Sequence, residues 1–390
     1  MHRPLSLSAR SRFDPGTSHD DAVAVGDVVD LSESNPTRVG LAGPVLASEI
    51  FRSAPVEPYA PDPLGLASAR QAIAKSYGER GISIDPGRIV LTASTSEAYA
   101  WLFKLLCDPG DEVLIPTPSY PLFECLARLE AVRTVSYPLL REEAFRIDIA
   151  MLRARIGERT RAIVVVAPNN PTGSLVHEED AHALDEIARE HGLALVVDEV
   201  FADYLFASPS PALRRSFAGA AMKSTCFVLS GLSKVLLSPQ LKLGWVLVGG
   251  PQSDELMHRL SVIADTFLSV SSPAQLALPA LLSARHTIQS EMSARLAENM
   301  KTLERLTADS TSRVRTLRPT GGWSALVEVP RVMSEDAWVT LLAREAGVRV
   351  QPGWFYDIED GGTLVLSLIV EPSRFQLGVE RLCQLVSRHS

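Results

Sequence analysis

Between about Arg88 and Gly250 the chain alternates short apolar runs with amphipathic segments. This alternation is typical of repeated βα units around a mostly parallel sheet, because parallel strands are buried on both faces and are therefore apolar along their whole length. The expected strands are Ile89 to Thr92, Glu112 to Pro116, Ala162 to Ala167, Leu193 to Asp198, Cys226 to Ser230 and Trp245 to Gly249. Ser96 to Leu106 and Glu178 to Glu190 show helical spacing of apolar residues. The pattern predicts an α/β fold whose large domain has three layers, αβα.

The C-terminal third has a different pattern. A long helical pattern runs from about Pro273 through Thr307, and strand-like segments follow at Ala325 to Val329 and Thr363 to Ile369. A closing helix is expected from Pro372 onward. This order favours a smaller α+β domain. The predicted boundaries are 55–275 for the large domain, and 1–54 with 276–390 for the small domain and its N-terminal arm.

Composition limits the partners that such a chain can have. With 390 residues, 46% of them hydrophobic, the chain can bury a sizeable core. The formal net charge of -8 argues against a nucleic-acid binder, because following phosphates requires clustered Lys and Arg. The four scattered cysteines show neither metal-site nor disulfide spacing, and no apolar stretch has the length of a membrane helix. We expect small-molecule partners, no metal, no nucleic acid, no membrane and a cytoplasmic location. The first twenty residues are open to two interpretations, a packing arm or a short transit peptide.

Polar clusters follow four of the expected strands. Residues 93–98 (Ala-Ser-Thr-Ser-Glu-Ala) begin a helix, where free N–H groups and hydroxyls can bind phosphate. Ser and Thr are also ordinary N-caps, which is the plainer interpretation. Residues 167–173 (Ala-Pro-Asn-Asn-Pro-Thr-Gly) form a turn that can hold the Asn170 amide as a donor to a ring oxygen. A purely structural turn is an equal alternative.

The other two clusters contain the charged candidates. Asp198 ends a strand so apolar that its carboxylate needs a cationic partner, such as a protonated pyridine nitrogen; an N-cap or an ion pair is the alternative. Lys234 ends the segment 230–234 (Ser-Gly-Leu-Ser-Lys). A lysine in a cleft loses its proton readily, and the neutral amine attacks aldehydes, although a lone lysine is usually a surface residue. Because ligands bind at the carboxyl ends of parallel strands, we expect all four clusters to meet.

Together these residues resemble the aspartate-aminotransferase family, the class I/II aminotransferases of fold type I, which depend on pyridoxal 5'-phosphate (PLP). Asn170, Asp198 and Lys234 match the family in order and spacing. The resemblance extends from about Asn35 to the C-terminus. It also includes Tyr59 with Pro61 and Gly65, and the run 108–113 (Asp-Pro-Gly-Asp-Glu-Val).

The resemblance implies a role for each matching residue. Lys234 would form the internal Schiff base and later move the substrate proton, and Asp198 would pair with the pyridine nitrogen. The other implied cofactor contacts are Ser94, Thr95, Ser96, Ser233 and Lys242 at the phosphate, Tyr120 stacked on the ring, Asn170 and the position of Phe201 at the ring oxygen, and Tyr59 from a neighbouring subunit. The implied function is transfer of an amino group between an amino acid or amine and a 2-oxo acid, in amino-acid metabolism and biosynthesis. A homodimer with shared active sites is implied as well.

Three positions depart from the family pattern. Phe201 stands where the family usually has a tyrosine that donates to the ring oxygen, and its loss should raise the pKa of the Schiff base. Lys242 stands in place of an arginine at the phosphate. Val365, in Val-Leu-Ser, stands where an arginine usually binds the substrate carboxylate.

The substrate contacts are therefore open. Candidates on the substrate side are Asn35, Arg38, Arg374, Trp323 and Phe355, with surface arginines and core aromatics as the alternatives. The missing arginine favours a second hypothesis, a PLP-dependent lyase, cyclase or deaminase acting on an unusual amino acid. A PLP-binding regulator would require a fused DNA-binding module, for which the N-terminal region offers no room. The donor, the acceptor and the pathway are not encoded in any motif.

Overall fold

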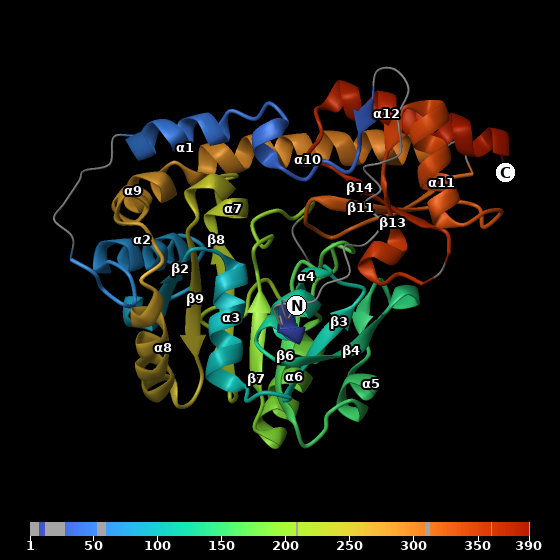
Figure 1. The fold of residues 1–390 in the computed structure, drawn as a ribbon. Coiled ribbons are helices and arrows are strands. Elements are labelled where there is room, and N and C mark those ends of the chain that lie inside the picture. The colour runs from blue at the N-terminus through green and yellow to red at the C-terminus, as the bar shows by residue number, and fades with distance from the viewer. Residues whose placement is uncertain are drawn as a thin grey trace, which may run out of the picture.

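The computed structural model describes residues 8–11, 28–52, 60–207, 210–308, 313–359 and 361–389. Within them lies an eight-stranded sheet with the order β2-β9-β8-β7-β6-β3-β4-β5 (Figure 1). The strands are β2 Ile89–Thr92, β3 Glu112–Thr117, β4 Arg133–Leu140, β5 Arg146–Ile147, β6 Thr160–Val166, β7 Ala194–Asp198, β8 Thr225–Gly231 and β9 Gly244–Gly249. Six of these strands run in the same direction, and β5 and β9 run antiparallel to them. The expected mostly parallel sheet is confirmed.

Strand β4 does not stand out in the sequence pattern. Its first residues are polar or exposed, and Pro138 lies within it, although proline is uncommon inside strands. It tolerates both because only the two-residue strand β5 continues the sheet beyond it.

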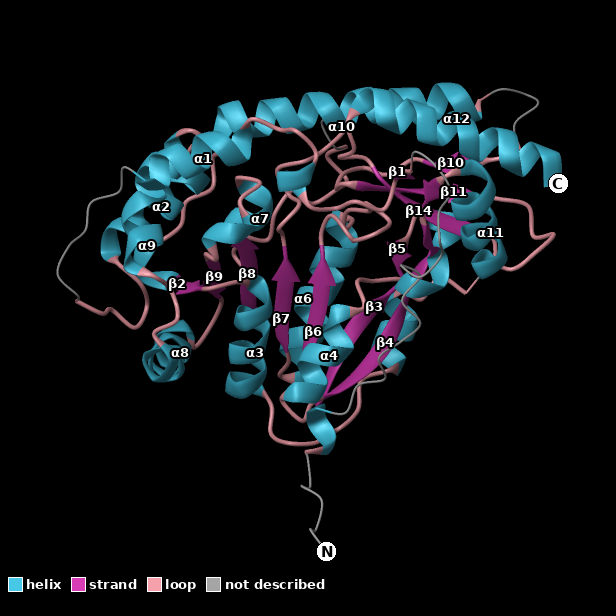
Figure 2. Ribbon diagram, turned by 45° about the horizontal axis from the view of Figure 1, so that its top comes forward, coloured by secondary structure: helices cyan, strands magenta, loops and turns pink. Residues whose placement is uncertain are grey.

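Helices cover both faces of the large sheet (Figure 2). In β6, Ala162 and Val164 belong to the core under α3 (Thr95–Leu106), whereas Ile163 and Val165 belong to the core under α6 (Glu178–His191). This alternation of the strand side chains produces the three αβα layers that were predicted. The other helices of these layers are α2 Ala67–Gly78, α4 Leu122–Leu129, α5 Ile149–Ala154 and α8 Ser253–Phe267.

A second, antiparallel sheet forms the smaller domain, with the order β10-β11-β14-β13. Its elements are β10 Arg315–Leu317, β11 Ser324–Glu328, α11 Glu335–Leu341, β13 Gln351–Pro352, β14 Thr363–Ser367 and α12 Pro372–His389. Near it, β1 (Val29–Asp30) pairs in parallel with β12 (Val348–Arg349). The domain boundaries at residues 54/55 and 275/276 stay predictions.

The long helical pattern of the C-terminal third forms two helices. Helix α9 (Ser272–Ser283) packs on α2, whereas α10 (Arg285–Thr307) packs on α12. The pattern divides at Ala284 because its two halves bury their apolar residues against different neighbours. Helix α10 runs beside α1 (Gly43–Arg52) along the top of the molecule in Figure 1.

In the part of the chain that the structure describes, no helix is long and apolar enough to cross a membrane. No group of three His, Cys, Asp or Glu side chains is arranged there to hold a metal ion. Among the described residues, the cysteines at 107, 125, 226 and 383 are not joined in disulfide bonds.

Candidate active site

The predicted site residues meet at one edge of the large sheet. The carboxyl ends of β2, β3, β6, β7 and β8 point the same way, and the antiparallel strand β9 begins at that edge. The residues at this edge are Ser94, Thr95 and Ser96 after β2, Tyr120 after β3, Asn170 after β6, Asp198 ending β7, Lys234 after β8 and Lys242 before β9. The topology therefore gathers segments that lie far apart in the sequence.

Lys234 belongs to the short helix α7 (Leu232–Val235), and its amine faces two aromatic rings. Its Nζ atom lies 4.6 Å from the ring centroid of Trp323 and 5.3 Å from that of Phe201. The two rings meet edge to face at 5.4 Å. Burial lowers the pKa of Lys234 to about 8, although the nearby charge of Asp198 acts in the opposite direction. The site thus makes the neutral, nucleophilic amine more abundant than it is for an ordinary lysine.

Asp198 is buried and holds two hydrogen bonds. The Tyr99 hydroxyl donates to its Oδ2 at 3.2 Å, and the backbone N–H of Val200 donates to its Oδ1 at 3.1 Å. Burial raises the pKa of Asp198 to about 6, while these bonds and Lys234 lower it. Tyr99 is absent from the sequence predictions, because its position on α3 carries no motif that would point to Asp198.

The start of α3 is built as a capping box. The Ser94 hydroxyl accepts from the N–H of Glu97 at 3.1 Å, and the Glu97 carboxylate accepts from the N–H of Ala93 at 2.6 Å. Ser94 therefore does what the plainer interpretation predicted. Thr95 and Ser96 are half-buried, and no hydrogen bond among the described residues involves their backbone N–H or side-chain hydroxyl groups. These donors lie at a helix N-terminus, where the helix dipole and the free N–H groups favour an anion.

Two glycines let the surrounding segments approach the start of α3. A Cβ atom on Gly244 would lie 3.2 Å from the Ser94 carbonyl carbon and 3.2 Å from the Ser230 oxygen. A Cβ atom on Gly231 would lie 3.1 Å from the Gly244 Cα. Side chains at either position would push β8, β9 and the start of α3 apart.

The turn after β6 separates a structural asparagine from a free one. The Asn169 side chain donates to the Pro118 carbonyl at 3.3 Å and accepts from the Thr172 hydroxyl at 2.9 Å. The side chain of Asn170 is half-buried and makes no hydrogen bond within the described residues. Asn169 therefore holds the turn, which leaves the amide of Asn170 available to a ligand.

The remaining cofactor candidates are more open to solvent. Tyr120 is 43% exposed, and Ser233 is half-buried. Lys242 is exposed and has a positive φ of 48°, directly after the 3-10 turn Pro239–Leu241. Tyr59 lies outside the described residues.

The substrate candidates divide into two groups. Trp323 is buried against Phe201, Tyr204 and Lys234, whereas the Phe355 ring is partly exposed and packs edge to face on Tyr356. Val365 is a buried residue of β14, so no cation stands at that position.

The polar substrate candidates have other partners. Asn35 caps a short 3-10 helix through Thr37, and the Arg38 side chain is 74% exposed, 3.7 Å from Glu33. Arg374 donates to the carbonyl of Val28. These contacts give none of the three polar side chains a defined substrate role.

Comparison with known proteins decides the family. The model of the family described as aminotransferase class I and II matches residues 37–366. The chain belongs to this aminotransferase family. It is 29% identical over 352 residues to an alanine aminotransferase of Mycobacterium tuberculosis, with 88% of this chain and 76% of that protein covered. It is 31% identical over 265 residues to the glutamate-pyruvate aminotransferase AlaA of Escherichia coli, with 67% and 65% covered.

Solved structures of aminotransferases share the fold. An aminotransferase from Escherichia coli superimposes with a TM-score of 0.85 at 25% identity, over all of both chains. An alanine aminotransferase from Pyrococcus furiosus superimposes with a TM-score of 0.82 at 24% identity, over 93% of each chain. The chain is thus a PLP-dependent transferase of fold type I, and the expected fold, enzyme class and cofactor are confirmed.

The geometry of this chain fits the cofactor of its family. A buried carboxylate at Asp198 suits a ring nitrogen that carries a proton, and the free amide of Asn170 suits a ring oxygen. The unused N–H groups at Thr95 and Ser96 suit a phosphate. The amine of Lys234 lies at the same sheet edge and is held partly neutral.

Proposed function

We propose that this enzyme transfers an amino group between an amino acid, or an amine, and a 2-oxo acid, with Lys234 as the covalent attachment point of PLP. One observation carries the proposal. Lys234 and Asp198 follow or end two neighbouring parallel strands, β8 and β7, and their pKa values move in opposite directions, to about 8 and about 6. Groups perturbed in this way cluster at functional sites.

When bound, PLP supplies an aldehyde that reacts with amines and a pyridine ring that accepts an electron pair. Asp198 would face the ring nitrogen and keep it protonated, because a buried carboxylate favours a cationic neighbour. Asn170 would donate to the ring oxygen, and Tyr120 would cover one face of the ring. The proposed phosphate ligands are Ser94, Thr95, Ser96, Ser233 and Lys242.

Lys234 would act twice in this mechanism. With a pKa of about 8, roughly a tenth of its amines are neutral at pH 7, far more than for an ordinary lysine. The neutral amine can attack an aldehyde carbon. Once a substrate amine has displaced Lys234, the freed Lys234 amine can remove the α-proton of the substrate. It can then return that proton at another carbon. Trp323 and Phe201 would exclude water from one side of this proton path.

The named relatives support a first choice of substrates. Relatives of this chain are named alanine aminotransferase and glutamate-pyruvate aminotransferase. We therefore propose alanine and glutamate as the donors to test first, with pyruvate as the first acceptor. Holoenzyme mixed with each amino acid, without an acceptor, should accumulate pyridoxamine phosphate, and pyruvate should then restore PLP. Turnover that releases ammonia and forms no pyridoxamine phosphate would overturn the aminotransferase proposal.

Val365 supports a second candidate function. Its buried apolar side chain stands where the family resemblance leads one to expect a carboxylate-binding arginine. A lyase, cyclase or deaminase that acts on an unusual amino acid would be compatible with that change. Ammonia release during turnover measures this alternative directly, so the same amino-acid panel separates the two candidates.

We further propose a homodimer in which Tyr59 reaches the neighbouring active site. Exposed apolar side chains on and beside α8, at Val262, Phe267 and Leu268, support a surface that another subunit covers. Mixing Tyr59→Ala protein with Lys234→Ala protein should restore up to about a quarter of the wild-type activity, because random pairing of two subunits produces hybrid dimers with one intact site. No recovery in verified hybrid dimers would contradict shared sites.

We propose a location in the cytoplasm, where thiols stay reduced, because the four described cysteines are not joined in disulfide bonds. Together with the proposed substrates, this supports a role in amino-acid metabolism and biosynthesis. Fractionation of the source cells, followed by immunodetection, tests the location.

A further inference from the structure

The helix that carries Lys234 is short and ends immediately after it. Helix α7 spans Leu232–Val235, and the last carbonyl groups of a helix lack partners within it. The Lys234 carbonyl accepts from the N–H of Leu237 at 3.3 Å, and two side chains from other elements add further hydrogen bonds. The Tyr204 hydroxyl donates to the Lys234 carbonyl at 2.6 Å, and the Gln289 amide donates to the Val235 carbonyl at 3.1 Å. The backbone of Lys234 is therefore held from outside its own helix.

Tyr204 also contacts the Trp323 ring, which faces the lysine amine. Its ring meets the Trp323 ring edge to face at 5.4 Å, and the same Trp323 ring lies 4.6 Å from the Lys234 Nζ. The Tyr204 carbonyl accepts from the N–H of Gly322 at 2.8 Å, which fixes the backbone just before Trp323. One buried tyrosine thus touches the lysine backbone and the aromatic ring beside the lysine amine.

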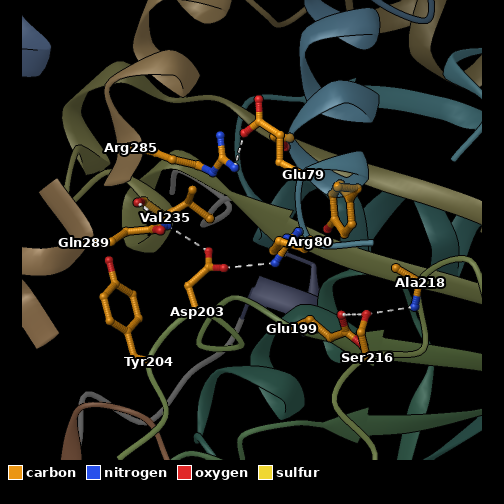
Figure 3. A network of polar contacts seen from close by, with 12 residues as sticks. Glu79, Arg80, Glu199, Asp203, Tyr204, Ser216, Ala218, Val235, Arg285 and Gln289 are labelled. Carbon is orange, nitrogen blue, oxygen red and sulfur yellow. Dashed lines mark hydrogen bonds and ion pairs between the residues drawn. The ribbon is translucent and has the colours of Figure 1, made fainter. Parts of the chain in front are cut away.

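Gln289 ties the second carbonyl to a charged pair. Its amide also donates to Oδ2 of Asp203 at 3.0 Å, and Oδ1 of Asp203 accepts from Arg80 at 2.9 Å. Figure 3 shows Gln289 between Val235 and Asp203, with Arg80 on the far side of the aspartate. Asp203 directly precedes Tyr204, so one loop after β7 supports both anchors. Gln289 connects this loop to α10, and Arg80 connects it to the turn that follows α2.

We propose that Tyr204 is a positioning residue for Lys234, with Gln289 and Asp203 as its supporting pair. The inference rests on the proposed function of Lys234. A catalytic base must stay at a fixed distance and orientation from the proton that it removes. Small displacements of the base lower the reaction rate. By fixing the backbone under the amine and the ring beside it, Tyr204 restricts where the amine can move. None of the three residues touches the reacting atoms.

The primary test is Tyr204→Phe, which removes one hydroxyl and keeps the ring against Trp323. In the holoenzyme, the single-turnover rate with alanine should fall about fivefold, the effect of one neutral hydrogen bond, with little change in the concentration for half-saturation. The kinetic isotope effect on this rate, measured with alanine deuterated at Cα, should rise because proton transfer limits the rate more strongly. Restoring tyrosine should return both values.

A second readout uses the apoprotein and does not depend on turnover. The rate of reductive methylation at Lys234, followed by peptide mass spectrometry across pH, reports the midpoint at which the amine becomes neutral. In Tyr204→Phe the amine gains freedom to reach water, so this midpoint should rise by at least about half a pH unit toward the value of an ordinary lysine.

The chain offers a matched control at Tyr137. Its hydroxyl is also buried and donates to a backbone carbonyl, that of Val164, at 2.7 Å. Tyr137→Phe therefore removes a similar hydrogen bond away from α7, and it should leave the methylation midpoint and the isotope effect unchanged. Gln289→Met serves as a second variant if Tyr204→Phe fails to fold, and it should change both readouts in the same direction.

The outcomes separate this proposal from the proposed function. If Tyr204→Phe matches Tyr137→Phe in methylation midpoint, single-turnover rate and isotope effect, Tyr204 does not position Lys234. If the wild-type protein instead shows no reaction with PLP at Lys234, the proposed function fails. The methylation midpoints still decide whether Tyr204 controls that amine, because they are measured without the cofactor.

Discussion

The Tyr99 hydroxyl donates to Oδ2 of Asp198 at 3.2 Å, from a helix whose first residues we propose to hold phosphate. Helix α3 therefore contributes to the site twice, through its N-terminus and through a side chain one turn further on. The capping box of Ser94 and Glu97 fixes where the helix begins. The distance between the proposed phosphate and ring-nitrogen contacts is thus set by one rigid element.

Removing the Tyr99 hydroxyl should weaken cofactor binding. In Tyr99→Phe, Asp198 loses a donor, its pKa rises further, and it holds a protonated ring nitrogen less well. A hydrogen bond to a charged group contributes about 1.5–3 kcal/mol, so the dissociation constant for PLP should rise about tenfold or more. Fluorescence titration of the apoprotein measures it. A constant within twofold of wild type would contradict the assigned role of Tyr99.

Phe201→Tyr should change the acid–base behaviour of the holoenzyme. Phe201 packs edge to face on Trp323 beside the Lys234 amine. A hydroxyl added there can donate to the ring oxygen, which favours the deprotonated imine. The midpoint of the pH-dependent change in the visible spectrum should therefore move to lower pH. A midpoint that stays constant or moves upward would show that residue 201 does not reach the ring oxygen.

The apoprotein should show an unusually reactive amine at Lys234. Amines are methylated in their neutral form, so the rate at Lys234 should rise with pH and reach half its maximum near pH 8. In Asp198→Asn this midpoint should fall, because the carboxylate favours the charged ammonium. Quantitative mass spectrometry of the labelled peptides measures both. A wild-type midpoint above pH 10 would mean that the amine is not desolvated.

Glu199 should make the protein less stable as the pH rises. Its carboxylate accepts from the Ser216 hydroxyl at 2.6 Å (Figure 3). It also accepts from the N–H of Phe217, yet burial raises the pKa of Glu199 from 4.5 to about 7. The unfolded chain loses this proton first, so the contribution of Glu199 to stability is full below pH 4.5 and is lost as the pH rises to about 7.

Glu199→Gln removes this titration. Between pH 5 and 7 the free energy of unfolding should fall with pH less steeply in the variant than in wild type, with a difference on the order of 3 kcal/mol at most. Urea unfolding of the apoprotein at several pH values measures the slopes. Glu186→Gln, at an exposed position of α6, is a control that should keep the wild-type slope. Parallel slopes for Glu199→Gln and wild type would contradict the prediction.

Much of the large domain could be predicted because its strands are buried on both faces. Such strands are continuously apolar, and each of the six expected strands agrees with the structure to within two residues at each end. Strand β4 was missed because it is polar at its start and contains Pro138. The expected gathering of Asp198, Asn170 and Lys234 at one sheet edge follows from parallel topology alone.

The contacts around those residues could not be predicted. Tyr99, Tyr204 and Gln289 reach the site from α3, from the loop after β7 and from α10, and no local pattern relates these positions to their partners. For Ser94, in contrast, the local sequence predicts more than one role. Its sequence context fits both an N-cap and a phosphate ligand, and only the geometry shows that the cap is formed.

Lys234 is the residue that we propose to bind PLP covalently. Borohydride reduction of the holoenzyme, followed by proteolysis and mass spectrometry, identifies the lysine that carries the phosphopyridoxyl group. The chain contains five other lysines, at positions 75, 104, 223, 242 and 301, which serve as internal controls. We predict the modification on Lys234 alone, with loss of the yellow absorbance. Stoichiometric modification of any other lysine, or none at Lys234, would contradict the assignment of Lys234.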